Sequence, residues 1–548
     1  MSTESGRRTV AFDDARDANV ADRFGGLGDR MDAARTARLS GPTSSPRLYG
    51  PTWSVRRPTR RRLEVALRGW RFPVGFVPVE ILVILFAGPI IGLLPLAAVL
   101  GYVIVTRMPL EWLIPGLLFL VLAVDNPGNR PADDMWKSPF LPIGKVLFEN
   151  LKPLPFSVLD IIFAVAAMRA VSMLMNRAAA GARRGVTIGV PPRYFLRCAL
   201  ISMVVMLWHE VHGVLGGGDW RQSLWQLRQA FWMPCIAVIV STIVTAPVIR
   251  RIERVVIWGA LIKAFTGFWF YFTVAKPKGL LPAYVGTHSD SVMYALILAM
   301  LGARFVAHRD QASRRQLLWV GPIMFLAMNI NGRRIVWVGV AGALAYVLAT
   351  SDRQLKRKLA TTVLALSPLI AIYFAIGMKS NARIFYPAKM VNSVLFQDDR
   401  SSQTRDVENY NLFVTYIQNP ILGPGAGHEY IEYVVGDDIS KIFPQYRYIP
   451  HNSYLGLWAF GGGPVASLYS FTWIAAVYCA TASLKRSKAP LVRASAQWAV
   501  AGIIAYLVQT FGDVGFQDWV PTIVVGVCCG VAGGLVPLSR RPAQELAA

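Results

Sequence analysis

Charged side chains are scarce in this sequence of 548 residues. Only 16% of the residues are Asp, Glu, Lys or Arg, whereas 54% are hydrophobic, and the mean hydropathy is +0.41. Apolar runs of about 17–22 residues recur along the chain, which is the length that an α-helix needs to cross a bilayer. The composition therefore excludes an ordinary soluble domain and predicts an all-α polytopic membrane protein.

Motifs for metals, nucleotides and covalent catalysis are also missing. The five cysteines lie within or beside apolar runs without zinc-type spacing, so we interpret them as packing residues. The pair His209 and His212 lacks the His-Glu-x-x-His spacing of zinc proteases. The sequence contains no GxGxxG, Walker A, CxxC or Ser/His/Asp pattern. We therefore predict that the protein uses no metal and no cofactor.

The formal net charge is +25, from 57 Lys and Arg against 32 Asp and Glu. Residues 1–72 contain fifteen arginines, no lysine and eight acidic residues, among many Gly, Ser, Pro and Asp. Such a composition is typical of a disordered segment. The basic cluster at 57–62 shortly precedes the first apolar run, where it suits a cytoplasmic segment facing anionic lipid. We therefore predict that this charge meets the lipid bilayer and not a nucleic acid.

The apolar runs predict 12–14 transmembrane helices. The stretch 76–105 is interrupted by Gly88, Pro89 and Pro95, so it is either one long span or a hairpin of two helices. Keeping both Arg107 and the N-terminal tail in the cytoplasm requires an even number of crossings, which favours the hairpin. The further predicted spans are 109–125, 157–175, 195–215, 228–247, 255–275, 291–307, 316–330, 334–350, 358–377, 453–480, 495–512 and 519–537.

Basic residues occupy alternate connections between these spans. Arginines 250, 251 and 254 and the basic run at 353–358 are examples, and the positive-inside rule places such connections in the cytoplasm. The loop 379–452 carries seven basic and eight acidic residues, a net of −1, and falls on the opposite side. Both termini are then cytoplasmic.

Five segments follow from this assignment. We expect a cytoplasmic, disordered tail at 1–72, transmembrane helices at 73–378, an extracytoplasmic loop at 379–452, C-terminal transmembrane helices at 453–538 and a cytoplasmic tail at 539–548. The loop is far longer than an ordinary connector, and loops of that kind are usually functional or disordered.

The long loop contains many aromatic and β-branched residues, which favours an ordered, partly helical cap. Residues 405–418 read as an amphipathic helix that ends at Asn419 and Pro420. We expect the catalytic residues in this loop and at its two ends.

Arg333 and Arg334 stand between two predicted spans on the outer side, where arginine is disfavoured. A charge at membrane depth needs a partner and marks a site by default, and a guanidinium suits a phosphate. The alternative is that the side chains reach lipid headgroups.

Arg405, with Asp406, Glu408 and Tyr410 close in sequence, either binds a ligand or forms a surface ion pair. His451 is one of only six histidines and precedes Asn452 and Ser453, which can cap the next helix. It is a candidate proton acceptor near neutral pH. The alternative is a residue of the capping region with no chemical role.

Two carboxylates also occur in the short outer loop 512–519. Asp513 and Asp518 are candidates for binding sugar hydroxyls, although we interpret them first as solvated loop residues.

Four stretches of the sequence carry a family resemblance in a fixed order. They are 286–291 (Gly-Thr-His-Ser-Asp-Ser), 332–337 (Gly-Arg-Arg-Ile-Val-Trp), Arg405 with 419–425 (Asn-Pro-Ile-Leu-Gly-Pro-Gly), and 451–455 (His-Asn-Ser-Tyr-Leu) followed by Phe460 and Gly461. Together they resemble the bacterial O-antigen ligase and O-antigen polymerase superfamily of membrane glycosyltransferases. The first stretch lacks that family's Asn-Pro pair. In the second, no serine precedes the arginine, and the spacing to Trp337 favours Arg334 as the equivalent arginine.

The resemblance implies a GT-C-like membrane enzyme of the bacterial plasma membrane with an extracytoplasmic active site. It implies metal-independent, inverting transfer of a glycan from an undecaprenyl-diphosphate carrier to a hydroxyl of an acceptor glycan or glycolipid, in surface polysaccharide biosynthesis. His451, Arg405 and Arg334 would be catalytic. The substrate-binding residues would be Arg333, Glu408, Tyr410, Asn452 and His288.

Polymerase and ligase differ only in the acceptor, and the sequence does not separate them. A secondary transporter or flippase of lipid-linked glycan is the alternative from another class. Lys263 and Arg228 lie within apolar runs, as that alternative requires.

Overall fold

The computed structural model describes residues 101–124, 141–151, 155–184, 189–279, 287–380, 385, 388–389, 400–436 and 445–547. The chain divides into two units, 1–96 and 97–548, and every described residue lies in the second. The predicted tail at 1–72 and all but the last few residues of the stretch 76–105 lie outside the described residues.

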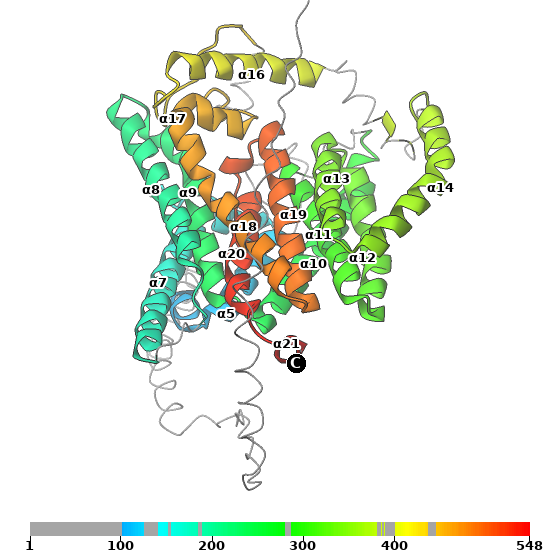
Figure 1. The fold of residues 1–548 in the computed structure, drawn as a ribbon. Helices are drawn as coiled ribbons and strands as arrows, with labels where there is room; N and C mark the ends of the chain where they lie inside the picture. The colour runs from blue at the N-terminus through cyan, green and yellow to red at the C-terminus, as the bar shows by residue number, and fades with distance from the viewer. Residues whose placement is uncertain are drawn as a thin grey trace, which may run out of the picture. The chain divides into compact units, whose positions relative to one another are not determined.

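The described part of the chain is a bundle of α-helices without named strands, which confirms the predicted all-α polytopic fold (Figure 1). Each of the predicted spans after residue 108 coincides with a helix. In chain order these are α5 (Leu110–Ala123), α7 (Val158–Arg184), α8 (Arg193–Leu215), α9 (Trp220–Ile243), α10 (Ala246–Phe270), α11 (His288–His308), α12 (Gln311–Asn331), α13 (Arg334–Ala349), α14 (Arg353–Gly377), α17 (Ser453–Tyr469) with α18 (Phe471–Arg486), α19 (Pro490–Gly512) and α20 (Trp519–Leu538).

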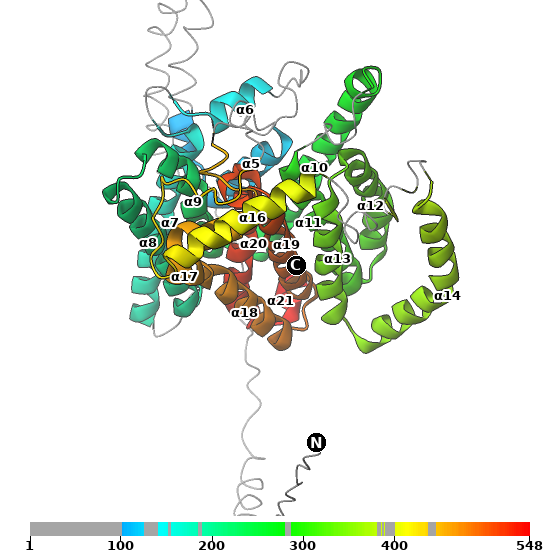
Figure 2. The ribbon, with the colours of Figure 1, turned by 90° about the horizontal axis from the view of Figure 1, so that it is seen from above.

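Four shorter or peripheral elements complete the described helices. They are α6 (Leu141–Phe148), the π-helix η2 (Tyr271–Ala275), the 3-10 turn η5 (Gly515–Gln517) and α21 (Ala543–Ala547). The cap helix α16 (Arg400–Gln418) extends the predicted helix at 405–418 by about one turn and lies across one end of the bundle, beside α17 (Figures 1 and 2). We call that end the cap end.

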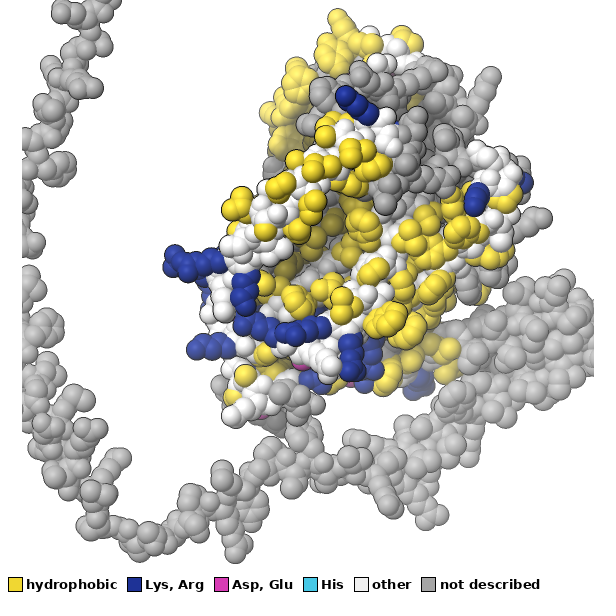
Figure 3. All heavy atoms as spheres, turned by 90° about the vertical axis from the view of Figure 1, so that its right-hand side faces the viewer, with side chains coloured by type: hydrophobic (Ala, Val, Ile, Leu, Met, Phe, Trp, Pro, Cys, Tyr) yellow, Lys and Arg dark blue, Asp and Glu magenta, His cyan; other side chains and the backbone are white. Residues whose placement is uncertain are grey.

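Seven of these helices are long and apolar enough to cross a membrane, and three shorter ones are also apolar. On the face shown in Figure 3, hydrophobic side chains cover the middle, and most Lys and Arg side chains gather at the edge away from the cap end. A wide apolar band above a basic edge is the pattern that a bilayer requires. The chain is a multi-pass membrane protein.

Close packing of small residues fixes the centre of the bundle. In α20 a side-chain Cβ at Gly530 would lie 2.5 Å from Cβ of Val240 on α9, and one at Gly534 would lie 2.4 Å from Cβ of Val244. Since no larger residue fits, the two helices approach as closely as their backbones allow. Nearly all of α20 is buried as a result.

One predicted boundary was wrong. The sequence suggested a loop near 247–255 because three arginines gather there, but α9 ends at Ile243 and α10 starts at Ala246. The proline after Ala246 lies in the first turn of α10, where a missing N–H costs no hydrogen bond. The arginines at 250, 251 and 254 therefore lie within α10.

Candidate active site

The site at the cap end is built around a histidine and a glutamate that are 43 positions apart. Glu408 is buried on the bundle side of α16, and its carboxylate accepts a hydrogen bond from the backbone N–H of His451 at 3.2 Å. The same carboxylate lies 3.2 Å from Nδ1 of the His451 ring. Because an ionised carboxylate only accepts hydrogen bonds, Nδ1 carries the proton, and Nε2 is the nitrogen that can take one.

The charges around His451 set its pKa. Burial lowers the pKa, but the hydrogen bond and negative charge of Glu408, together with the charge of Asp513, outweigh burial and raise it above its usual value. Arg405, one helical turn before Glu408, acts in the opposite direction. The histidine is therefore a stronger base than an isolated imidazole, and its side chain is 32% exposed.

The neighbours of His451 are tied to the same helix. Asn452 caps α17 by accepting a hydrogen bond from the N–H of Leu455 at 3.0 Å, and it donates through Nδ2 to Oδ1 of Asn409 at 3.0 Å. The residue predicted to bind substrate thus performs a capping role in the described structure. It fixes the start of α17 against α16.

Glycines let the loop after α16 reach the bundle. Gly423 has φ +62°, and a Cβ there would lie 2.1 Å from the carbonyl oxygen of Phe460. The N–H of Gly425 donates to the same oxygen at 2.8 Å, and α17 is broken at Gly462, where φ is +68°. The two motifs at 419–425 and 451–461 are therefore in direct contact. A side chain at Gly423 or at Gly462 would push them apart.

The two arginines of the second motif lie at the start of α13. Gly332 ends α12 in the left-handed conformation, Arg333 is the N-cap of α13 and Arg334 its first helical residue. Both side chains are partly exposed. A helix N-terminus carries partial positive charge and unpaired N–H groups, so the arginines and the helix together favour an anion.

The short loop between α19 and α20 contacts three of the sequence motifs. Ser453 Oγ lies 3.0 Å from the carbonyl oxygen of Asp513, and a Cβ at Gly512 would lie 3.0 Å from Cδ1 of Ile335, the residue after Arg334. Ser289 of the first motif donates to the carboxylate of Asp518. The loop therefore joins the arginine motif to the histidine motif.

Both loop carboxylates are buried, so the expectation that Asp513 and Asp518 are solvated was wrong. Asp518 also caps α20 by accepting from the N–H of Val520 at 3.2 Å. A hydrophobic cluster around Phe516 pulls the loop into the bundle, which single-sequence reading of a short polar connection does not reveal.

Two further residues, Tyr410 and His288, were predicted to bind substrate. Tyr410 points away from the buried face of α16 and is 47% exposed, with its ring centroid 6.1 Å from that of Tyr433. His288 begins α11, but its side chain lies outside the described part of the chain.

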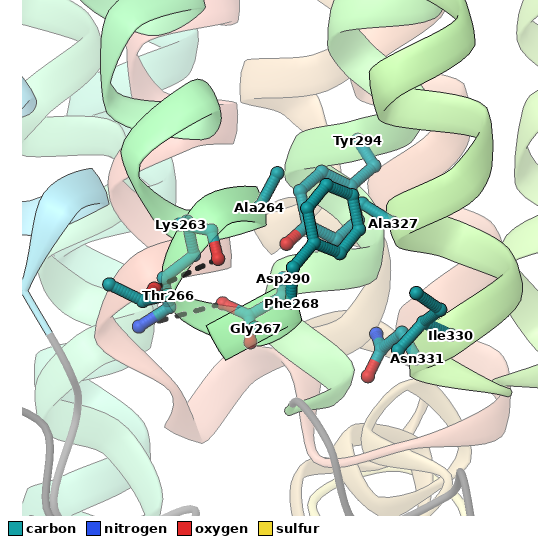
Figure 4. Close-up of a pocket in the computed structure, with 10 residues that line it drawn as sticks. All are labelled: Lys263, Ala264, Thr266, Gly267, Phe268, Asp290, Tyr294, Ala327, Ile330 and Asn331. Carbon is teal, nitrogen blue, oxygen red and sulfur yellow. Dashed lines mark hydrogen bonds and ion pairs between the residues drawn. The ribbon is translucent and has the colours of Figure 1, made fainter. Parts of the chain in front are cut away.

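The two cations within apolar runs form ion pairs between helices. Nζ of Lys263 on α10 lies 3.9 Å from the carboxylate of Asp290 on α11 (Figure 4). It also donates to the carbonyl oxygen of Val124 at 3.3 Å. Nη1 of Arg228 lies 3.6 Å from the carboxylate of Asp160. Each of the two cations therefore has a carboxylate partner inside the protein, as a buried charge requires.

Three histidines lie where α8 meets the glycine-rich segment 423–427. His209 and His212 belong to α8, and His428 follows the segment. His212 lies with Nε2 3.2 Å from the carbonyl oxygen of Gly423, and His428 with Nε2 3.2 Å from that of Gly213. Within the described ranges, no three His, Cys, Asp or Glu side chains are grouped to hold a metal ion.

Fold and site together define a multi-pass helical membrane protein with a polar cluster at one end of its bundle. Residues 319–470 match the family model described as O-antigen ligase, and this range contains Arg334, Arg405, Glu408 and His451. No curated protein matches the chain. This match supports the predicted O-antigen ligase and O-antigen polymerase superfamily, and with it a glycosyltransferase-type enzyme of surface polysaccharide synthesis.

Sequence reasoning did not find the contact between Glu408 and His451, nor the role of the 512–519 loop. Glu408 was singled out only as a supporting or sugar-binding group. No spacing rule connects residues 43 positions apart. The one available signal was a polar residue, Glu408, on the face of an amphipathic helix that must pack against the bundle.

Proposed function

We propose that the protein transfers a glycan from an undecaprenyl-diphosphate carrier to an acceptor hydroxyl on the extracytoplasmic side, with His451 as the general base. The observation that carries this proposal is the carboxylate of Glu408, 3.2 Å from Nδ1 of His451. It orients the ring and stabilises the imidazolium that forms when Nε2 takes a proton.

The reaction is an inverting displacement at the anomeric carbon. The acceptor oxygen forms the new glycosidic bond as the bond between the sugar and the diphosphate breaks, and the diphosphate leaves with the bonding electrons. The proton of the acceptor hydroxyl passes to Nε2 of His451. No metal takes part in this scheme, so positively charged side chains must stabilise the charge that builds on the diphosphate.

Arg334 and Arg333 are suited to that role because they stand at the N-terminus of α13. Arg405 supplies a third positive charge close enough to act on His451. We assign Arg334, Arg405 and His451 to catalysis, and Arg333 to binding of the diphosphate. Glu408 is a positioning residue, since it acts through His451.

The proposal also assigns the orientation. On the face shown in Figure 3, basic residues lie mostly at the edge away from the cap end, which supports a cytoplasmic location for that edge and an extracytoplasmic location for the site. Both the lipid-linked donor and a membrane-anchored acceptor can reach a site at this depth.

Complementation of a deletion strain tests the function. His451→Ala and Arg405→Ala, each checked for normal membrane expression, should both abolish the surface glycan. Accumulation of single repeat units on the carrier would identify a polymerase, and accumulation of long chains on the carrier would identify a ligase. If both variants restore normal glycan, the transferase assignment fails and the transporter alternative replaces it.

A further inference from the structure

Helix α14 lies at the edge of the bundle, on the outer side of α12 and α13 (Figures 1 and 2). It is long and apolar enough to cross a membrane, but none of residues 353–376 is buried among the described parts of the chain. The apolar helix α20, by contrast, is buried in the bundle. The described part of the chain therefore leaves the apolar side chains of α14 open to the bilayer.

A basic patch lies where α12 and α14 begin, at the edge away from the cap end. Residues 309–315 contain three arginines and one aspartate, and residues 352–358 contain four basic residues and one aspartate, a net of +5 for the two segments together. We call these two segments the basic patch. An ion pair between Arg309 and Asp352 joins them, so the first turns of α12 and α14 lie close together.

The positive charge of the basic patch is presented to the surroundings. Arg314 and Arg315 on α12 and Arg357 and Lys358 on α14 are all exposed. Figure 3 views the molecule from the side on which α14 lies and shows Lys and Arg side chains along this edge, below the hydrophobic middle. An anion in the adjoining leaflet can therefore reach the patch from the bilayer.

Each of the two helices also carries exposed apolar side chains above its basic residues. On α12, Trp319 follows Arg315 by four positions and is 75% exposed. On α14, Leu364 follows Arg357 by seven positions and is 74% exposed. Residues with these spacings share one face of a helix. Both helices thus present a basic group with an apolar surface directly above it, which is the order of headgroup and acyl chain in a lipid.

We propose that the basic patch and the apolar faces above it bind an anionic phospholipid in the leaflet away from the cap end. The lipid phosphate contacts the basic patch, and the acyl chains lie along α12 and α14. Charge favours an acidic headgroup, because the net charge of +5 repels the ammonium group of a zwitterionic lipid. The exposed Trp319 and Leu364 favour a lipid over a soluble phosphate, because only a lipid has acyl chains to cover them.

This lipid site is separate from the proposed reaction. Arg333 and Arg334 follow the opposite end of α12, and a helix of 21 residues is about 30 Å long. The lipid at the basic patch is therefore not the carrier whose diphosphate those arginines are proposed to bind. The lipid site stands whether or not the protein transfers glycan.

Native mass spectrometry of the full-length protein, freed of lipid in detergent and titrated with single lipids, tests the proposal. The probes are phosphatidylglycerol and phosphatidylcholine with the same acyl chains, and glycerol phosphate as a headgroup without acyl chains. Phosphatidylglycerol should bind at least fivefold more tightly than phosphatidylcholine, and glycerol phosphate should not displace it.

Two double variants remove charge from the basic patch, and a third is the matched control. Arg314→Gln with Arg315→Gln, and Arg357→Gln with Lys358→Gln, should each weaken phosphatidylglycerol binding at least fivefold, because one basic residue near an anionic lipid contributes about fivefold. The control removes two charges from the connection before α19, a mostly buried helix. Lys485→Gln with Arg486→Gln should change the binding less than twofold.

Thermal unfolding provides a second readout. A ligand that binds only the folded protein raises the unfolding midpoint, so phosphatidylglycerol should raise it more in the wild type than in the two patch variants. Equal binding of the two lipids, or an equal loss in the control variant, would overturn the proposal. Displacement by glycerol phosphate would replace the lipid with a soluble anion. A dimer that persists without lipid and that Leu364→Ser dissociates would assign the face of α14 to a second copy of the chain.

Discussion

Helices α20 and α16 are similar in length, at 20 and 19 residues, but they are held by different interactions. The α20 helix contains no charged residue, and glycines let it lie close against α9. The α16 helix turns polar side chains, Glu408, Asn411 and Thr415, toward the rest of the protein. Its exposed side carries rings such as Tyr410 and Phe413.

This difference separates the scaffold from the chemistry. Packing of small apolar side chains gives α20 a fixed position but no group that could react. The inward face of α16 is polar because it holds His451 and the segment 430–436 by hydrogen bonds. That face also buries Leu412 against Tyr430 and Phe460, so it is polar only in part, and buried polar groups of this kind are expected at functional sites.

The largest expected effect belongs to the site. His451→Ala should lower the rate of glycan transfer by purified protein about 10²–10⁴-fold, because a positioned general base contributes that much. Because the substitution also removes the side-chain partner of the buried Glu408 carboxylate, it should lower the thermal unfolding midpoint, so the rate is compared for folded protein only. A rate within tenfold of the wild-type rate would show that another group takes the proton.

A substitution in α20 should have the opposite profile. Gly530→Ala places a Cβ 2.5 Å from Val240 and should reduce the free energy of unfolding by about 1–3 kcal/mol, while folded protein keeps its transfer rate. The matched control is Gly116→Ala on α5, where no atom lies within 4 Å of the new Cβ. Equal unfolding midpoints for the two variants in one detergent would contradict the close packing of α9 and α20.

Substitutions of the two arginines at the start of α13 should affect the reaction and not the scaffold. Arg334→Lys should reduce transfer about tenfold, because lysine keeps the charge but loses the planar fork that holds two phosphate oxygens. Arg333→Lys serves as the matched variant and should reduce transfer less. A larger loss in Arg333→Lys would exchange the roles of the two residues.

The smallest effect should come from the cap of α17. Asn452→Ala removes the side-chain oxygen that accepts from Leu455 and should cost about 1 kcal/mol of stability. Asn452→Ser restores a capping oxygen and should recover most of it. If Ala and Ser behave alike in thermal unfolding, the bond to Asn409 matters more than the cap.

The sequence allowed the scaffold to be predicted in detail because a bilayer demands long apolar helices, and such runs are visible one by one. Every predicted span after residue 108 has its helix, and the helix at 405–418 lies within α16. The site was only partly predictable. Arg334, Arg405 and His451 were singled out from motifs and position, and residues 319–470 match the O-antigen ligase family.

The parts of the site that the sequence could not reveal depend on contacts between residues that are far apart in the sequence. The approach of Glu408 to His451 and of Gly512 to Ile335 joins residues 43 and 177 positions apart. The burial of Asp513 follows from the packing of Phe516 in an aromatic cluster and from no local pattern. Polar groups brought together by tertiary structure carry no periodicity of their own.

The pH dependence of glycan transfer, measured for the wild type and for Glu408→Gln, tests the central claim most directly. A general base acts when it is neutral, and Glu408 contributes to raising the pKa of His451, so wild-type activity should rise with pH through an apparent pKa above about 6.5. Removing the carboxylate charge lowers that pKa, so the acidic limb of Glu408→Gln should move to lower pH while its maximal rate falls. An acidic limb at the same pH in both proteins would contradict the assignment of His451 and Glu408 as the base and its positioning residue.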